Sequence, residues 1–363
     1  MKRSRHFILI CKSLLLFCLA CVPKKQDDTY LQVAMQTVDE HPQQALAVLE
    51  EIPYPQYMEH DNYMSYVVTL TQARYMNYQD ITGDTLILEA QRYFADKDNP
   101  EMAARASYYA AAYWHEKGTE KNALEYFLLA NYYARQAENN LFQAKSAHWI
   151  GSTYYDQDVL DSAQVYYHQA EKLYRTIANT EIQQLDIKYM LGRTYRELEQ
   201  YHLSLSYLEE GLDAAQKLGN QLYEAKFMHC KGIIFRGRKE FQQAKECFNS
   251  ALLKKIDVED SLMIYHNYAK LYRMCNQPDS TKYYLDLVKN RVGELSFPYN
   301  RRNVYKELVF YYENEENSPE VEHYLRLVTK SYIDIFNAYG VHPKYRQSTS
   351  HLKRKLCRKQ TEI

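Results

Sequence analysis

Glycine, proline and tryptophan are scarce in this chain, and its net charge is close to zero. Its 363 residues include 10 Gly, 9 Pro and 2 Trp, and the formal net charge is −1. So few turn-forming residues disfavour a β-sheet protein with many tight turns, and long helices are the natural interpretation. A net charge of −1 gives no bulk attraction to polyanions, so we expect no nucleic-acid partner.

Sequence motifs of several enzyme classes are missing as well. The chain contains no G-x-x-x-x-G-K-[ST], G-x-G-x-x-G or G-x-S-x-G. Their absence excludes the common phosphate-binding loops and the nucleophile elbow. His115-Glu116 continues as Lys117-Gly118-Thr119, without the second histidine of a zinc protease motif. The sequence therefore predicts a protein that is not an enzyme, with no catalytic residues, no metal and no cofactor.

What the chain does contain is one pattern of small and large residues, repeated at a spacing near forty. In the clearest copy Gly232 is followed by Phe235, Ala244 and Phe248. Small side chains let two antiparallel helices approach closely, and a large aromatic ring fills the space beside the crossing. The small residue of successive copies stands at Gly151, Gly192, Gly232, Ala269 and Val309. Fixed-period self-similarity is typical of a solenoid, because one helix pair cannot bury its apolar face alone.

These copies resemble the tetratricopeptide repeat family. The resemblance covers about six repeats over residues 100–337, and the spacing is longer than the usual 34 residues, as in some bacterial signalling proteins. The fullest copies are Ala111 to Ala130, Gly151 to Ala170, Gly192 to Gly211 and Gly232 to Ala251. The resemblance implies an all-α, right-handed superhelical solenoid of antiparallel helix pairs, with a concave groove that binds another protein or a peptide.

Residues 29–99 are expected to form a helical cap and degenerate repeats. His41-Pro42 can begin a helix, because proline lacks only a donor that the first turn leaves unused. Further helices are expected over about Asn62 to Tyr78 and after Gly83-Asp84-Thr85. The module, including Leu70-Thr71-x-Ala73, resembles the amino-terminal part of long-repeat lipoproteins and membrane-bound regulators of the Bacteroidetes. There it caps the solenoid, whose end would otherwise expose apolar surface.

The amino terminus has the layout of an export signal. Basic residues precede an apolar stretch from Phe7 to Val22, which at about 1.5 Å per residue is short for a membrane helix. Cys21 follows Ala20 and resembles a bacterial lipoprotein cleavage site, which implies lipid on Cys21. Ordinary secretion and an uncleaved anchor are the alternatives. The favoured prediction is a signal peptide over 1–21, a tether over 22–28, and a membrane-anchored lipoprotein of the bacterial cell envelope, periplasmic or on the outer surface.

Cysteine and tyrosine usage both favour packing over chemistry. Cys230 and Cys247 fall on opposite helices of one repeat, so a disulfide is conceivable in an oxidising compartment, but buried free thiols are the favoured state. The chain has 37 tyrosines, many in adjacent pairs such as Tyr154-Tyr155 and Tyr311-Tyr312. A tyrosine can bury its ring while its hydroxyl reaches water, so we interpret these pairs as packing residues.

The candidate binding residues come from the groove positions of the family. The second, fifth, ninth and twelfth places of each repeat line the groove there, and we count them back from the small residue. Cations, histidines and tyrosines dominate these places. The predicted set is Arg105, Tyr108, Lys145, His148, Tyr155, Tyr189, Arg193, Arg196, Lys226, His229, Arg236, His266, Lys270 and Arg273. Guanidinium groups one repeat apart can bind successive carboxylates of an extended acidic peptide.

A second interpretation of this face has equal support. Its cations can pair with acids of the protein itself, for example Arg196 with Glu197 or Glu199, which would leave a salt-bridged inner surface. One histidine per repeat is too widely spaced for a compact metal site.

The carboxyl-terminal residues 338–363 are expected to be a basic tail, with seven Lys or Arg from His342 onward and one acid. The sequence as a whole predicts a non-enzymatic scaffold for a protein or an acidic peptide. One alternative is the sensory half of a membrane-associated transcription regulator or kinase whose output domain is absent. A glycan-binding lipoprotein is a third, disfavoured because Trp114 and Trp149 fall at or beside packing positions.

Overall fold

All regular structure in residues 26–339, the part of the chain that the computed structural model describes, is helical. This confirms the predicted all-α class. The predicted signal peptide, the lipid on Cys21 and most of the basic tail lie outside the described residues. Residues 26–28, assigned to the tether by the sequence, are already helical. None of the helices within 26–339 combines the length and apolarity that crossing a bilayer requires.

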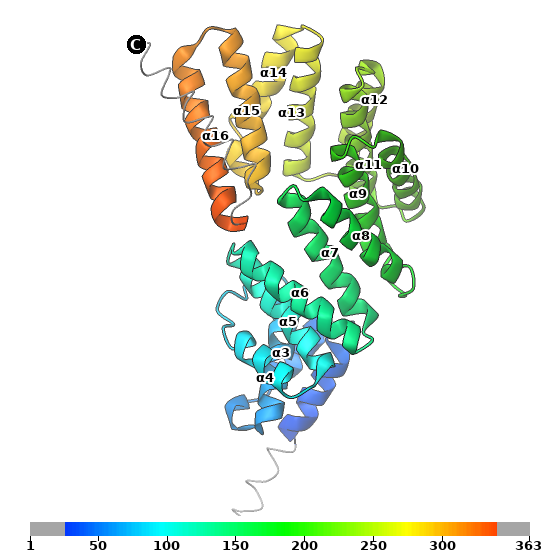
Figure 1. Ribbon diagram of the computed structural model, residues 1–363, viewed down its shortest axis with the longest axis vertical. Helices are drawn as coiled ribbons and strands as arrows, with labels where there is room; N and C mark the ends of the chain where they lie inside the picture. The colour runs from blue at the N-terminus through cyan, green and yellow to red at the C-terminus, as the bar shows by residue number, and fades with distance from the viewer. Residues whose placement is uncertain (1–25, 340–363) are drawn as a thin grey trace, which may run out of the picture. The chain divides into compact units, whose positions relative to one another are not determined.

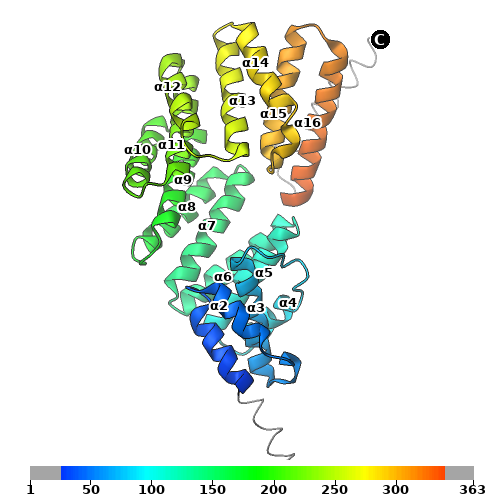
Figure 2. The same ribbon diagram turned by 180° about the vertical axis from the view of Figure 1, so that it is seen from behind.

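The chain divides within helix α7 into two compact units, residues 1–146 and 147–363, which we call the N-terminal and C-terminal units. The N-terminal unit begins with a helix over 26–37. Its later elements are α2 (Pro42–Glu50), the 3-10 helix η1 (Pro55–Tyr57), α3 (His60–Met76), α4 (Ile87–Asp96), α5 (Pro100–Glu116) and α6 (Glu120–Gln136), followed by α7 (Asn140–Asp156) at the boundary. Figure 2 shows α2 and α3 from behind.

The C-terminal unit continues as helix pairs with short connections. Its elements are α8 (Leu160–Tyr174), α9 (Glu181–Glu197), α10 (Tyr201–Lys217), α11 (Gln221–Gly237), α12 (Phe241–Leu252), α13 (Val258–Met274), α14 (Pro278–Lys289), the 3-10 helix η2 (Val292–Glu294), α15 (Pro298–Asn314) and α16 (Ser318–Tyr339). Within each pair the two helices lie side by side, as α13 with α14 and α15 with α16 do in Figure 1. We call α7, α9, α11, α13 and α15 the first helices of their pairs.

The small residues of the repeat pattern lie where paired helices cross. A Cβ atom added to Gly232 on α11 would come within 2.5 Å of the Phe248 ring on α12. The same test on Gly192 gives 2.6 Å to Leu208, the residue at the equivalent place on α10. Real Cβ atoms do not approach that closely, so only glycine permits these crossings with the large partner in place.

The turns of the C-terminal unit repeat with the same period. Five non-glycine residues with positive φ end its first helices, each seven positions after the small residue of its repeat. They are Asp158, Glu199, Lys239, Asn276 and Glu316, with φ between 53° and 63°. Gly118 holds the equivalent place after Ala111 in the N-terminal unit. A left-handed residue just past a helix end lets the chain reverse while the last carbonyls keep hydrogen bonds.

Tyrosines join the two helices of a pair, as the sequence predicts for several of the pairs. Tyr154 stacks on Tyr166 with ring centroids 5.8 Å apart, and Tyr312 stacks on Tyr324 at 5.7 Å. The prediction does not hold for every member of the adjacent pairs, since Tyr283 of the Tyr283-Tyr284 pair is 60% exposed.

Cys230, Cys247 and Cys275 are free thiols. Cys230 is buried, as the favoured interpretation expects, whereas Cys247 is only half-buried.

Candidate binding face

The predicted binding residues of the N-terminal unit are engaged in its own packing. An Arg105 Nη atom lies 3.0 Å from Asp39 Oδ2, and the guanidinium carbon lies 4.9 Å from the centroid of the Phe142 ring. Tyr108 is buried and packs edge-on against the same ring at 5.5 Å. Lys145 Nζ lies 5.2 Å from that centroid, and burial lowers the pKa of this lysine. Tyr108 therefore stabilises the core instead of lining an open surface, which corrects its assignment.

In the C-terminal unit the predicted positions of α7, α9, α11 and α13 form one continuous layer, which we call the first-helix face. Contacts between successive first helices bring its members together. His148 Nε2 on α7 lies 3.1 Å from Asp186 Oδ2 on α9. The members are His148, Tyr155, Tyr189, Arg193, Arg196, Lys226, His229, Arg236, His266, Lys270 and Arg273.

Cations and aromatic rings alternate in the first part of the face. The Arg193 guanidinium lies between two rings, 4.7 Å from the centroid of Tyr155 and 5.4 Å from that of Tyr189. Lys226 Nζ lies 6.0 Å from the Tyr189 centroid and 5.3 Å from that of Tyr223. Burial raises the pKa of Tyr189 to about 12, so its phenol is neutral. The electron-rich ring faces attract both cations and hold them in place.

The arginines at the twelfth place of successive repeats each connect one first helix to the next. They are Arg196, Arg236 and Arg273, and they donate to Cys230 Sγ at 3.1 Å, to Asn267 Oδ1 at 2.9 Å and to Glu307 Oε1 at 2.5 Å respectively. Arg196 also forms an ion pair with Glu197 at 2.5 Å. The salt-bridged interpretation therefore describes Arg196 and Arg273, whose charges are already compensated, and these arginines stabilise packing between repeats.

The hydrogen bonds around Asn267 determine the protonation state of a buried histidine. Because the amide oxygen of Asn267 accepts from Arg236, its nitrogen must donate, and it lies 2.9 Å from His229 Nε2. His229 Nε2 is then the acceptor and the ring is neutral. Burial, together with Arg196 and Arg236, lowers the pKa of His229 to about 3. The ring is thus a fixed polar contact rather than a charge.

A second group of cations is crowded together without matching acids. Burial and repulsion from Arg236 lower the pKa of Lys270 to about 8. Burial lowers the pKa of Arg236 to about 10. Within residues 26–339 no carboxylate forms an ion pair with either of them, nor with Arg193 or Lys226. The face therefore combines two ion-paired arginines with four cations that form no ion pair within residues 26–339.

Sequence reasoning named Glu197 as a partner of Arg196 but missed the other two acids and the amide that complete the layer. Glu197, Asp260, Asn267 and Glu307 lie outside the four counted places, on the flanks of the same helices. Burial raises the pKa of Asp260, and the charge of nearby Lys226 lowers it by a smaller amount. The buried Oδ2 atom of Asp260 has no hydrogen-bond partner. A signal existed for Asn267, which directly follows the counted His266, and for Glu307, which directly follows Lys306 at the fifth place of its repeat.

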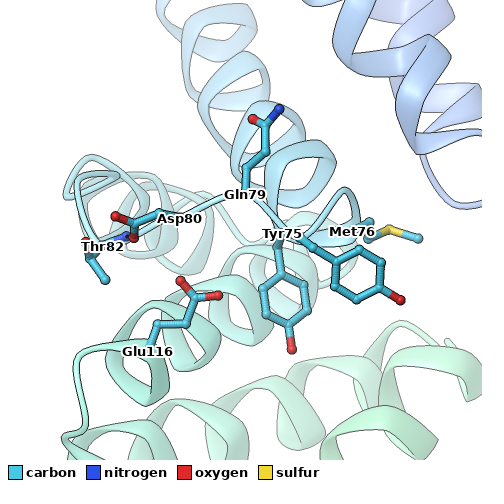
Figure 3. A pocket seen from close by; sticks show the side chains of 7 residues that line it. Tyr75, Met76, Gln79, Asp80, Thr82 and Glu116 are labelled. Carbon is cyan, nitrogen blue, oxygen red and sulfur yellow. Dashed lines mark hydrogen bonds between the residues drawn. The ribbon is translucent and has the colours of Figure 1, made fainter. Parts of the chain in front are cut away.

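The described part of the chain holds no cluster of metal ligands, and the cavity found in the N-terminal unit is not lined by predicted site residues. In the described part of the chain no three His, Cys, Asp or Glu side chains are grouped so as to hold a metal ion. A cavity of about 700 Å³ lies in the N-terminal unit, at the carboxyl ends of α3 and α5 (Figure 3). It is lined by Tyr75, Met76, Tyr78, Gln79, Asp80, Thr82 and Glu116. Its two carboxylates hold the loop, since Glu116 accepts from the Ile81 amide at 3.2 Å and Asp80 from the Thr82 amide at 2.8 Å.

The comparisons with known proteins establish the fold. No family model and no curated protein matches the chain, but solved structures do. The apo form of the quorum sensor NprR from B. thuringiensis has a TM-score of 0.63 at 15% identity, over 93% of this chain and 99% of that one. NprR in complex with its cognate peptide NprX gives 0.62 at 15% identity, over 92% and 98%. The fold is tetratricopeptide-like, as predicted.

A third similar structure is the Rap conjugation gene regulator of the plasmid pLS20 in complex with the Phr* peptide. Its TM-score is 0.56 at 13% identity, over 93% of this chain and 96% of that one. These similarities to a quorum sensor and a gene regulator contradict the predicted location as a membrane-anchored lipoprotein of the cell envelope. The resemblance to Bacteroidetes lipoproteins is likewise unsupported, and we withdraw both.

Proposed function

We propose that this protein is a non-enzymatic scaffold that binds an acidic peptide on the first-helix face of its C-terminal unit. One observation carries the proposal: Arg193, Lys226 and Lys270 have no carboxylate partner within residues 26–339. Tyr155 and Tyr189 lie among these cations and add apolar contact area. An extended peptide with acidic side chains would supply the missing counter-charges through charge-assisted hydrogen bonds.

The comparisons support a peptide as the ligand class. Two of the structures that share this fold over more than nine tenths of the chain contain a peptide, NprX in one and Phr* in the other. Because NprR is a quorum sensor, a second candidate function is a sensor whose peptide controls binding to a separate protein. A glycan-binding role has less support, since Trp114 and Trp149 are both half-buried.

The proposal predicts that two lysines control the capture of acidic peptides. The full chain would be applied to immobilised synthetic decapeptides that differ in their number of Asp and Glu residues. Lys226→Gln with Lys270→Gln should reduce capture of the best acidic peptides at least tenfold. Each charge-assisted hydrogen bond contributes about 1.5–3 kcal/mol, and a tenfold change corresponds to about 1.4 kcal/mol.

The matched control removes two lysines from second helices. Lys172 on α8 and Lys217 on α10 are exposed, and their replacement by Gln removes the same charge from the chain. This control should retain capture, and circular dichroism should show both double variants folded. Equal loss in both variants would mean that overall charge governs capture, and equal retention would place the binding site elsewhere. Either result contradicts the proposal.

A further inference from the structure

Two half-buried cations at the junction of α11, α13 and α15 form no ion pair within residues 26–339. Arg236 on α11 and Lys270 on α13 are crowded enough for their charges to repel each other. The nearby carboxylates are Glu197 of α9 and Glu307 of α15, and they already form ion pairs with Arg196 and Arg273 at 2.5 Å each. His229 and His266 are neutral, because burial lowers the pKa of both. Within residues 26–339 Arg236 and Lys270 therefore have only longer-range attraction from these carboxylates and no ion pair of their own.

The hydrogen bonds of Arg236 leave part of its guanidinium unused. Nη1 donates to Asn267 at 2.9 Å and is fixed by that contact. Nε is buried and has no hydrogen-bond partner. A buried donor without an acceptor is destabilising, so an orphaned Nε near an ammonium that forms no ion pair is a position where a bound anion would be stabilised. A carboxylate is planar and matches a guanidinium edge.

We propose that Arg236 and Lys270 form a subsite for one carboxylate group of the bound peptide. This inference rests on the proposed function and gives that ligand an anchor point. The carboxylate would accept from Arg236 Nε and from the Lys270 ammonium. This carboxylate is either the C-terminus of the peptide or the side chain of an Asp or Glu residue, since both groups have the same chemistry.

Binding at this subsite is linked to pH through Lys270. The groups facing it are Glu197 from α9, Arg236 from α11, His266 and Arg273 from its own helix, and Lys306 and Glu307 from α15. In the free protein burial and these cations lower the pKa of Lys270 to about 8, and a bound carboxylate raises it again. Affinity is therefore highest where Lys270 is already charged, below about pH 8, and falls as the pH rises above that value.

The first test uses acetate as the probe and the lysine itself as the reporter. The full chain, with its lysines reductively methylated with ¹³C, would be titrated by NMR in sodium chloride and in sodium acetate of equal ionic strength. Lys270→Arg assigns the resonance. We expect Lys270 to titrate near pH 8 in chloride and at least about one pKa unit higher in acetate. Lys217, which is exposed, serves as the internal control.

Three outcomes of this test would overturn the inference. They are an ordinary lysine titration in chloride, a Lys270 titration that acetate leaves unchanged, and an equal acetate shift at Lys217. Arg236→Gln should abolish the acetate shift if the variant folds. If Arg236→Gln does not fold, the titrations of the wild type in the two salts still decide the question, because Lys270→Arg is needed only to assign the resonance.

A second experiment separates this inference from the proposed function and identifies the source of the carboxylate. The best peptide from the decapeptide array would be compared with its C-terminal amide and with versions in which each Glu or Asp becomes Gln or Asn. One of these changes in the peptide should weaken its binding to the wild-type protein at least tenfold. The same change should leave its binding to the Lys270→Gln variant nearly unaltered. Acetate binding without peptide capture would contradict only the scaffold proposal. Peptide capture that no carboxylate change weakens would contradict only the subsite.

Discussion

At the scale of single residues, the arginines of the repeats illustrate how the same side chain can stabilise a fold or remain available to a ligand. Arg273 is paired with Glu307 on the next first helix, whereas Arg193 is held between two tyrosine rings with its charge uncompensated. Reversal of the charge at Arg273 would therefore break a contact between repeats as well as any contact with a ligand. The lysines Lys226 and Lys270 separate these effects better, because no carboxylate of the described chain is lost with them.

The neutral state of His229 leads to a prediction about stability in acid. In the unfolded chain a histidine takes up a proton near pH 6.5, whereas the folded-state pKa of His229 is about 3. The unfolded state therefore binds more protons between these values, and stability falls as the pH falls below about 6.5. One such histidine costs about 1.4 kcal/mol per pH unit, or about 2 kcal/mol at pH 5. His229→Gln, which keeps an acceptor for Asn267, should remove this loss.

Urea unfolding of the wild type and of His229→Gln at pH 7 and pH 5 would measure the effect. His202→Gln is the control, because His202 is exposed on α10. The variant at position 229 should lose about 2 kcal/mol less on acidification than the control. If both proteins lose the same stability, His229 is not held neutral by the fold.

At the scale of elements, the helix pairs could be predicted because their crossings depend on side-chain size alone. Gly192 and Gly232 mark crossings in the sequence and occupy them in the structure. The turn residues of the C-terminal unit could not be predicted in the same way. The left-handed position after the first helix holds Asp158, Glu199 or Lys239. Only the packing of the finished pair imposes that conformation, and no local preference of a lysine or glutamate indicates it.

The crossing of α11 and α12 predicts opposite effects for two glycines on one helix. Gly232→Ala would place a Cβ atom 2.5 Å from the Phe248 ring, and overpacking of this kind costs about 1–3 kcal/mol. Gly237, the last residue of α11, has open space around it, so Gly237→Ala should stabilise the helix by up to about 1 kcal/mol. Urea unfolding measures both. Adding Phe248→Leu to Gly232→Ala should recover part of the loss, and no recovery would mean that the crossing is not the cause.

At the scale of the whole molecule, the repeat period determines the class of fold but not the partner. The counted places predicted which side chains of α9, α11 and α13 lie together. The pairing of Arg196 with Glu197 could be predicted because the two residues are adjacent, whereas that of Arg273 with Glu307 could not, because Glu307 lies on the next first helix. Charge compensation depends on the distance between neighbouring helices, which the sequence pattern does not encode.

The two compact units predict an unfolding transition that is not two-state. Each unit has a core of its own, one around Leu31, Leu49 and Ala73 and others in the C-terminal unit, such as that around Phe248. In a solenoid, stability is approximately a sum of repeat and nearest-neighbour terms, so a local defect need not reach distant repeats. Gly232→Ala should therefore destabilise the C-terminal unit more than the N-terminal unit.

The two tryptophans make this difference measurable, since Trp114 lies on α5 in the N-terminal unit and Trp149 lies in the C-terminal unit. Trp114→Phe leaves Trp149 as the only tryptophan, and Trp149→Phe leaves Trp114. Gly232→Ala would be added to each, and fluorescence followed in urea. We expect the midpoint reported by Trp149 to fall clearly and that reported by Trp114 to move much less. Equal shifts at both tryptophans would show that the chain unfolds as one cooperative body, and that the division into units has no energetic counterpart.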